Sequence, residues 1–377
     1  MLWIITSLVV LSFYGILIGF YHFSWSRIPD AFNSVFRANT SVSVIIIGRN
    51  EAERLVTCIR SITHNDYPKE MFEIIYVDDH SEDDSVALLQ AMSEDNLQIL
   101  ELEDHLQGKN INSYKKEGIN YALQRAKGRL IIHTDADTLV GPKWISHHVE
   151  CFQSRSSIFA TAPVLIFAQD GFIRHFQMYD FISTMGVTGA GIESGLHHMA
   201  NGANMSYDRK WRDGIVQQNE NAYASGDDMF LIHMAAAEDE EKVVFLKNPA
   251  ASVKTFAESD WSGFFEQRFR WAGKTKAYTD RKIQLVAALV FLANLMILLT
   301  AILSLTDSYY FSLLFALFLL KGLIDYSFLR RIGKYYDVTF NLAYLLLSMA
   351  FYPVYYLIVG IRAMIPLKYE WKSRMVR

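Results

Sequence analysis

The chain has 377 residues, of which 51% are hydrophobic and only 20% charged, so it exceeds one minimal domain and is more apolar than an ordinary soluble enzyme. Its net charge of -4 excludes a broad basic field, and we expect no nucleic acid partner. The two cysteines, Cys58 and Cys151, are far apart without a CxxC spacing. This excludes a disulfide framework and a zinc site and favours a reducing compartment.

Four apolar segments predict helices that cross a membrane. The first, residues 2–23, matches the roughly 20 helical residues that a hydrocarbon core requires. A cleaved signal peptide is the alternative there, but the stretch has no basic leading region and no small-x-small cleavage site. Three further segments cover residues 283–305, 309–328 and 338–365. The residues between the first and second segments are soluble in character.

The distribution of basic residues predicts the orientation of these segments. Arg281 and Lys282 precede the second segment, and further basic residues follow the third, whereas the link at residues 306–308 has none. The positive-inside rule then places the central region in the cytosol and the amino terminus outside. A single last crossing would leave the basic tail outside, whereas a chain reversal at Pro353 would return it. We expect the reversal and a cytosolic tail.

The central region alternates between strand and helix patterns. Residues 41–47, 72–77 and 129–133 are short runs rich in β-branched residues, and helical spacing follows the first two. A further helix is expected near residues 115–126, with Gly128 as its C-cap. This order predicts an α/β fold with a Rossmann-like, doubly wound parallel sheet, whose ligands bind at the carboxyl ends of the strands.

Paired carboxylates follow two of the predicted strands. Asp135 and Asp137 form a D-x-D motif, and its hard oxygen ligands suit Mg²⁺ or Mn²⁺ beside substrate phosphates. Asp78 and Asp79 follow another strand and could accept hydrogen bonds from a nucleoside. Either pair alone is compatible with an ordinary turn, since Asp is common there. Two acidic strand ends in one sheet indicate a nucleotide and metal site instead.

Seven ordered motifs give the sequence a resemblance to a known family. They are VSVIIIGRNEAERL, IIYVDDHSEDDS, GKNIN followed by KKEGI, GRLIIHTDADTLVGPKWI, NGANMSY, SGDDMFL and QRFRW. The chain resembles the family 2 glycosyltransferases, in the membrane-bound branch that includes ceramide glucosyltransferase and hyaluronan synthase. The resemblance covers about residues 41–274. It implies a GT-A fold, a nucleoside-diphosphate sugar, a divalent metal and inversion at the anomeric carbon.

The resemblance assigns the donor side of the site residue by residue. Asp137 matches the direct metal ligand, with Asp135 as the second carboxylate of the motif. A lysine near the diphosphate is matched by Lys109, but the spacing to the next motif is long, so Lys115 and Lys116 remain alternatives. The nucleotide-binding loop and the carboxylates near the nucleoside are matched by Arg49, Asn50, Glu51, Asp78 and Asp79.

The acceptor side and the membrane-proximal motif are assigned in the same way. The catalytic Glu-Asp pair of the family appears as Asp227-Asp228, a departure at its first position, and Asp228 matches the general base. Both residues also fit a helix N-cap. The Q-x-x-R-W motif, implied to contact the donor, comprises Gln267, Arg268, Arg270 and Trp271, and the sugar and acceptor pocket is matched by Gly202, Ala203 and Asn204.

We predict four regions in the chain. Residues 1–24 form a transmembrane helix and residues 25–40 a juxtamembrane linker. Residues 41–280 form the GT-A-like domain with the interfacial Q-x-x-R-W segment, and residues 281–377 form transmembrane or interfacial helices and a basic tail. Within the domain, residues 172–192 resemble an amphipathic interfacial helix that ends in a flexible glycine-containing loop, and a core helix is the alternative.

The resemblance implies the transfer of a sugar, from a UDP-sugar first of all, to a membrane lipid or lipid-linked acceptor. A processive polysaccharide synthase of the chitin, hyaluronan or poly-N-acetylglucosamine type is the alternative, although few apolar segments are present for a secretion channel. A transporter is disfavoured because Lys321, Asp325 and Arg362 are the only Lys, Arg, Asp or Glu residues within the predicted spans. We expect an integral protein of a bacterial-type inner or cytoplasmic membrane, with its catalytic domain in the cytosol.

Overall fold

Strands and helices alternate through the first half of the central region, as the sequence predicts. The computed structural model describes residues 1–30, 37–108, 111, 113–167, 169–218, 227–274, 280–365, 369–371 and 374–376. The first elements are β1 (Val42–Gly48), α2 (Leu55–Thr63), η1 (Lys69–Met71), β2 (Phe72–Asp78), α3 (Ser85–Gln90), β3 (Leu97–Glu101), α4 (Leu102–Leu106), α5 (Tyr114–Arg125) and β4 (Leu130–Asp135). β1 is buried along nearly its whole length, as expected for a Val- and Ile-rich strand covered on both faces.

The remaining elements of this region complete two sheets. They are β5 (Leu139–Val140), α6 (Trp144–Arg155), β6 (Phe159–Thr161), β7 (Val164–Ile166), β8 (Met205–Asp208), α8 (Arg209–Gln218), α9 (Asp227–Glu238), η2 (Glu240–Lys242), β9 (Val243–Phe245), η3 (Pro249–Ala251) and β10 (Val253–Thr255). The main sheet has the strand order β3-β2-β1-β4-β8-β6-β9, and a small sheet has the order β5-β10-β7.

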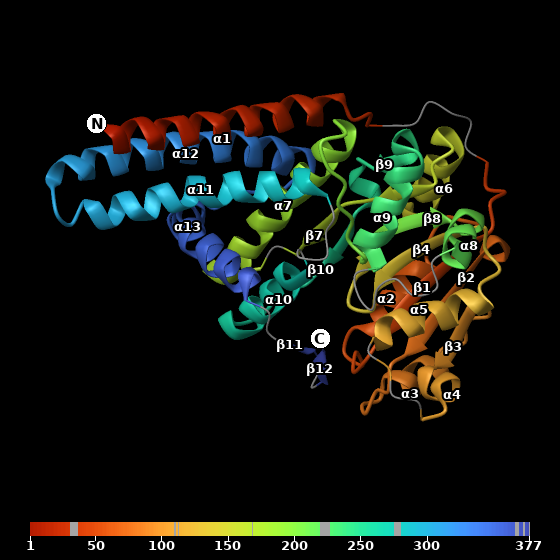
Figure 1. The fold of residues 1–377 in the computed structure, drawn as a ribbon. Helices are drawn as coiled ribbons and strands as arrows, with labels where there is room; N and C mark the ends of the chain where they lie inside the picture. Colours follow the sequence, from red (N-terminus) through yellow and green to blue (C-terminus); the bar gives the residue numbers. More distant parts are fainter. Residues whose placement is uncertain are drawn as a thin grey trace. The chain divides into compact units, whose positions relative to one another are not determined.

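The register of the main sheet aligns the ends of three strands. β1 pairs in parallel with both β2 and β4, and β2 pairs in parallel with β3. Across these pairs Gly48 lies opposite Asp78, and Ile47 lies opposite Asp135. Strand β8 is antiparallel to both β4 and β6, so the sheet is mostly rather than wholly parallel. The loops that carry the acidic motifs therefore leave the sheet at one edge (Figure 1).

Two glycines permit close approaches that a side chain would block. A Cβ at Gly48 would lie 2.8 Å from the ring of Tyr76, and a Cβ at Gly128 would lie 2.3 Å from the backbone nitrogen of Ser43. Gly128 was expected to cap the helix before β4. That expectation is wrong, because α5 already ends at Arg125 and is followed by Ala126 in extended backbone. Gly128 instead lets the chain pass beside β1.

The chain divides into two compact units, and each is described by itself. The α/β unit comprises residues 28–167 and 198–256, with the last residues of the chain. The helical unit contains α1 (Leu2–Arg27), α7 (Phe172–Glu193), α10 (Trp261–Lys274), α11 (Arg281–Leu303), α12 (Ser308–Tyr335) and α13 (Leu342–Met364). A short ribbon of β11 (Tyr369–Trp371) and β12 (Arg374–Val376) ends the chain. The domain expected at residues 41–280 thus contains two helices, α7 and α10, that pack in the helical unit.

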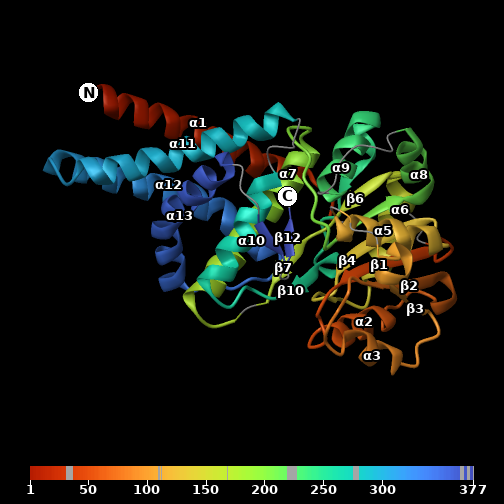
Figure 2. The same ribbon diagram turned by 60° about the horizontal axis from the view of Figure 1, so that its bottom comes forward.

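Four helices of the described chain, α1, α11, α12 and α13, are long and apolar enough to cross a membrane. They correspond to the four segments that the sequence predicts. Within the helical unit α1, α11 and α12 contact one another and run side by side in both views (Figures 1 and 2). Helix α7 packs against α1, α12 and α13.

Two expectations for this unit are wrong. Pro353 lies inside α13, which continues from Leu342 to Met364 without reversing. At 1.5 Å per residue, a helix of 23 residues spans about 35 Å, so the argument for a cytosolic tail fails. The glycine-containing end of residues 172–192, which was expected to form a flexible loop, is also helical, because α7 runs through to Glu193. Gly186 there allows α12 to approach closely, since a Cβ would lie 2.7 Å from Ile332.

A polar network joins α1 to α12 among the apolar helices. The Lys321 ammonium lies 2.6 Å from the Asp325 carboxylate, whose other oxygen accepts a 2.6 Å hydrogen bond from Tyr14. Lys321 is buried, and its ammonium also lies 5.3 Å from the ring centroid of Tyr352 on α13. A buried charge needs such a partner, because its desolvation in an apolar region is expensive.

We expect Asp325→Leu alone to destabilise the protein by about 3–5 kcal/mol, because it leaves the buried Lys321 charge without its partner, and Lys321→Leu to cost less, because the Asp325 side chain is 31% exposed. The double variant should lose about 1–2 kcal/mol at most, since no uncompensated charge remains. Denaturation midpoints of the purified variants in detergent measure the difference. Additive losses in the double variant would show that the two charges do not stabilise each other.

Candidate active site

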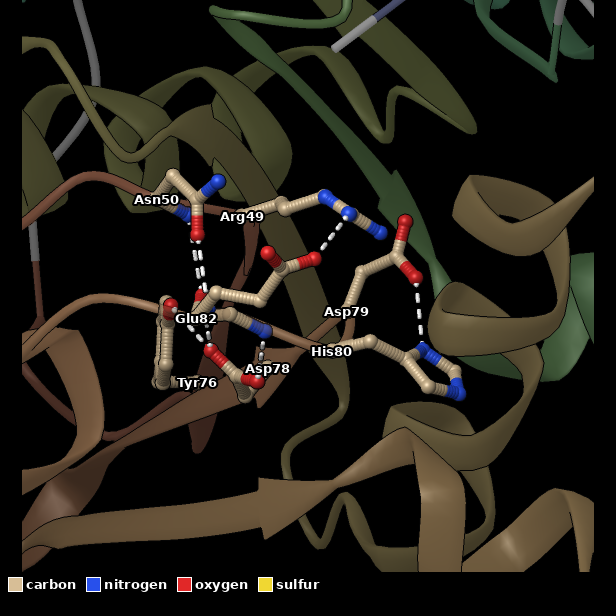
Figure 3. A network of polar contacts seen from close by, with 8 residues as sticks. Arg49, Asn50, Tyr76, Asp78, Asp79, His80 and Glu82 are labelled. Atoms are coloured by element: carbon tan, nitrogen blue, oxygen red, sulfur yellow. Dashed lines mark hydrogen bonds and ion pairs between the residues drawn. The ribbon is translucent and has the colours of Figure 1, made fainter. Parts of the chain in front are cut away.

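The loops after β1 and β2 are fastened to each other by hydrogen bonds (Figure 3). The Asn50 N–H donates to the Ser81 hydroxyl at 2.9 Å, and the Asn50 side-chain oxygen accepts from the Glu82 N–H at 2.8 Å. Arg49 is buried and forms a 3.0 Å ion pair with Glu82. Asn50 has a φ of 53°, a left-handed conformation that Asn tolerates better than most residues. The first loop therefore depends on the second for its shape.

Asp78 and Asp79 have different surroundings although they are neighbours. The Asp78 carboxylate accepts hydrogen bonds from the Ser81 N–H, the Ser81 hydroxyl and the Tyr76 hydroxyl, at 2.8, 2.6 and 3.1 Å. It therefore shapes its own loop. Asp79 is fully buried and lies 3.0 Å from His80 Nδ1. In Figure 3 its carboxylate extends to the same side as the Arg49 guanidinium.

The D-x-D motif lies at the end of β4, in a concentration of negative charge. Burial raises the pKa of the Asp137 carboxyl to about 6, with further contributions from the charges of Asp135 and Glu51, while Arg54 opposes the shift. The Asp137 carboxylate also accepts a 3.3 Å hydrogen bond from the Thr255 hydroxyl. A cation bound here would relieve the repulsion among the three carboxylates. The motif is thus chemically suited to a hard divalent ion.

One of the three candidate lysines lies next to this motif. The Lys115 ammonium forms a 2.9 Å ion pair with Asp135. It comes from the first turn of α5, and both side chains are partly exposed. Lys109, the first candidate from the sequence, lies outside the described residues. Lys115 is therefore the candidate whose position beside the motif is described.

The candidate base, Asp228, lies in the first turn of α9. One carboxylate oxygen accepts from the Gly202 N–H at 3.3 Å and the other from the Met229 N–H at 2.9 Å. Asp228 is only partly buried. The side chain of Asp227 lies outside what the structure describes. The carboxylate of Asp228 therefore has a defined direction, toward the segment that begins at Gly202.

Within that segment, Asn204 and Gly202 have different hydrogen-bond partners. Asn204 is fully buried, and its amide group donates to the carbonyls of Pro163 and Ala251 at 2.8 and 2.9 Å. Its oxygen accepts from the Trp144 indole at 3.0 Å. Asn204 thus holds the segment against the core, while the Gly202 N–H donates a hydrogen bond to the candidate base, Asp228. A contact of this segment with sugar stays a prediction.

The Q-x-x-R-W motif lies on α10 of the helical unit. Arg268 is buried and forms a 3.0 Å ion pair with Asp180 of α7, and its guanidinium lies 4.4 Å from the Trp271 ring centroid. Gln267 donates to Glu258 at 2.9 Å and accepts from Arg268 at 2.8 Å. Arg268 therefore stabilises the packing of α10 on α7. Arg270 and Trp271 are more exposed, and a donor contact for any of these residues stays a prediction.

Three residues near Asp137 were missed by sequence reasoning. Arg54 lies 3.9 Å from the Asp137 carboxylate and 4.5 Å from the ring centroid of Phe256, and Thr255 binds Asp137 directly. Arg54 is part of the first motif, VSVIIIGRNEAERL, so the sequence already places a cation in the loop after β1. Thr255 and Phe256 come from β10 and its end, a strand of three residues whose place in the small sheet has no sequence signal.

The fold and these loops define an α/β enzyme with acidic groups and cations at the carboxyl edge of its sheet. Such an edge is where open α/β sheets bind their ligands. The chain matches the family model described as "Glycosyl transferase family group 2" over residues 130–360, more than half of its length, and "Glycosyl transferase family 2" over residues 43–215. The chain belongs to the family 2 glycosyltransferases, which confirms the resemblance read from its motifs.

Known proteins similar to this chain include one relative and several solved structures. Glycosyltransferase AglE of Haloferax volcanii is 34% identical over 110 residues, which cover 29% of this chain and only 34% of that relative. The mannosyltransferase PcManGT from Pyrobaculum calidifontis, solved in complex with GDP-Man and Mn²⁺, is 13% identical, with 96% of each chain covered and a TM-score of 0.55. Residues 1–349 of S. aureus TarS are 15% identical, covering 89% of this chain and 95% of that one, with a TM-score of 0.42. The likeness to PcManGT confirms the GT-A-like fold.

Proposed function

We propose that this glycosyltransferase moves a sugar from a nucleoside-diphosphate sugar to a membrane lipid or lipid-linked acceptor, with inversion and with a divalent metal. The observation that carries the proposal is the aligned register of β1, β2 and β4, which brings the Asp79 and Asp137 loops to one edge of the sheet. The four long apolar helices support an acceptor held in the membrane.

Asp137 and Asp135 would hold the metal. Among the described residues no three His, Cys, Asp or Glu side chains gather as a complete metal site, so the donor phosphates would supply the remaining oxygen ligands, a common arrangement for Mg²⁺. When bound, Mg²⁺ or Mn²⁺ supplies charge neutralisation for the departing diphosphate. PcManGT, the structural neighbour, was solved with Mn²⁺.

Side chains of the protein would bind the nucleoside and the diphosphate and would accept the proton of the acceptor. Asp79 would accept hydrogen bonds from the nucleoside, and Arg49 would lie beside it. Lys115 would face the diphosphate, as its ion pair with Asp135 indicates. Asp228 would take the proton of the acceptor hydroxyl as that oxygen attacks the anomeric carbon and the bond to the nucleoside diphosphate breaks.

We expect purified membranes that contain the protein to transfer radiolabelled sugar from one nucleotide sugar, tested with UDP- and GDP-sugars, to a low-mass product extractable into organic solvent. Excess EDTA should abolish the transfer and Mn²⁺ or Mg²⁺ should restore it, because the two carboxylates bind the diphosphate only through the ion. Membranes without the protein are the control. A water-insoluble polymer would favour the processive alternative, and full activity in EDTA would exclude the metal-dependent mechanism.

A second prediction concerns the proton-transfer group. Asp228→Asn should lower kcat by about 10²–10⁴-fold, the usual contribution of a general base, and leave the KM for the donor nearly unchanged. Asp227→Asn is the matched variant, and we expect a clearly milder loss. If Asp227→Asn were the inactive one, the family correspondence would be shifted by one residue.

We further propose that the α/β unit faces the cytosol and the link between α11 and α12 faces outside. The native cysteines cannot report this, because Cys58 and Cys151 are fully buried and burial raises the pKa of each thiol to about 12. We therefore expect an impermeant maleimide to label Thr306→Cys but not Ser93→Cys on intact cells, both being exposed positions. Permeabilised cells, in which both should react, are the control. The reverse pattern would overturn the orientation.

A further inference from the structure

We propose that Arg54 is a catalytic residue that binds the diphosphate of the donor and stabilises the charge that develops as this group departs. The proposal rests on the nucleotide-sugar transfer proposed above and adds a residue that the family motifs do not assign. Arg54 precedes the first turn of α2, where the positive end of the helix dipole adds to its charge. Three observations locate and orient its side chain.

The first observation is the position of the guanidinium beside the metal-binding carboxylate. Arg54 Nη1 lies 3.9 Å from Asp137 Oδ2. A metal held by Asp137 would be shared with the donor phosphates, so those phosphates must come close to the same carboxylate. A guanidinium at this distance from Asp137 is therefore also within reach of them.

The second observation is that Arg54 and Asp137 are too far apart for a direct hydrogen bond. Charge-assisted hydrogen bonds join their atoms at about 2.7–2.9 Å, and Lys115 reaches Asp135 at 2.9 Å. The separation between Arg54 and Asp137 is 1 Å longer than that closed pair (3.9 - 2.9). The Arg54 side chain is also 42% exposed. Its planar set of N–H donors thus remains accessible to a phosphate.

The third observation is the platform that holds the guanidinium in place. Its central carbon lies 4.5 Å from the centroid of the Phe256 ring, within the range of a cation–π interaction. Phe256 in turn packs on Phe167 with ring centroids 5.0 Å apart. An arginine oriented by an aromatic ring loses less freedom when it binds a ligand. Phe256 is therefore a positioning residue for Arg54.

The charge balance of the reaction explains why a second cation helps. When the bond between the anomeric carbon and the diphosphate oxygen breaks, the electron pair stays on that oxygen, and the diphosphate gains one negative charge. Asp135, Asp137 and Glu51 already contribute negative charge around the metal position. A cation fixed beside the leaving group lowers the energy of the transition state more than that of the bound donor.

The test compares Arg54→Gln and Arg54→Lys with Arg60→Gln, which removes the same charge from an exposed position within α2. We expect Arg54→Gln to lower kcat about 10- to 100-fold and to weaken inhibition by UDP or GDP, measured with Mn²⁺, by a similar factor. Inhibition by UMP or GMP should change less than about threefold, because Arg54 is assigned to the diphosphate. Arg54→Lys should recover part of the loss, and Arg60→Gln should match the wild type.

Phe256→Leu keeps the Arg54 charge and removes its platform, so it should show a weaker form of the same defect. Arg54→Gln that matches Arg60→Gln, or that weakens monophosphate and diphosphate inhibition equally, would overturn the inference while leaving the proposed transfer intact. A wild type that transfers no sugar and binds none of the four nucleotides would overturn the proposed function, and the role of Arg54 with it.

Discussion

The parallel register of β1, β2 and β4 is the constraint on which the proposed donor site depends. Because Gly48 pairs with Asp78 and Ile47 pairs with Asp135, loops more than 80 residues apart in the chain begin at the same level of the sheet. A shift of one residue in either pairing would turn the side chains of that strand to the opposite face. Gly48 protects this alignment, since any side chain there would collide with Tyr76.

The alignment also concentrates charge. Glu51, Asp135 and Asp137 come from two loops, and their mutual repulsion contributes to the raised pKa of Asp137. Two cations in the described structure lie next to these carboxylates: Lys115 of α5 pairs with Asp135, and Arg54 at the start of α2 pairs with Asp137. The three carboxylates outnumber the two cations at this site. Its unfavourable electrostatics are what a nucleotide-sugar donor with its metal would relieve.

The strand ends could be predicted because they rest on local patterns. Buried β-branched runs identify β1, β2 and β4, the last two of which end in Asp, and hydropathy identifies α1, α11, α12 and α13. Long-range pairing has no such signal. The antiparallel insertion of β8 next to β4 and the small sheet that brings Thr255 to Asp137 depend on contacts between segments more than 70 residues apart.

The errors have a common physical cause, the tertiary context of flexible or breaking residues. Glycines in α7 were expected to end a helix, but close packing on α12 favours small residues there. Pro353 was expected to reverse the chain, yet neighbouring helices keep α13 continuous. For Arg268 the structure adds a partner that the motif does not predict, Asp180 of the helical unit, and its contact with the donor stays a prediction. A sequence motif gives the residue type at a position, but it does not predict which side chains contact that residue in the folded protein.

The most direct test of the donor site is an experimental structure of the protein with UDP or GDP and Mn²⁺. We expect the nucleoside to lie at the carboxyl ends of β1 and β2, next to Asp79, and the metal to contact Asp137 and the diphosphate. A nucleotide bound away from this edge of the sheet, or a metal held without Asp137, would contradict this expectation.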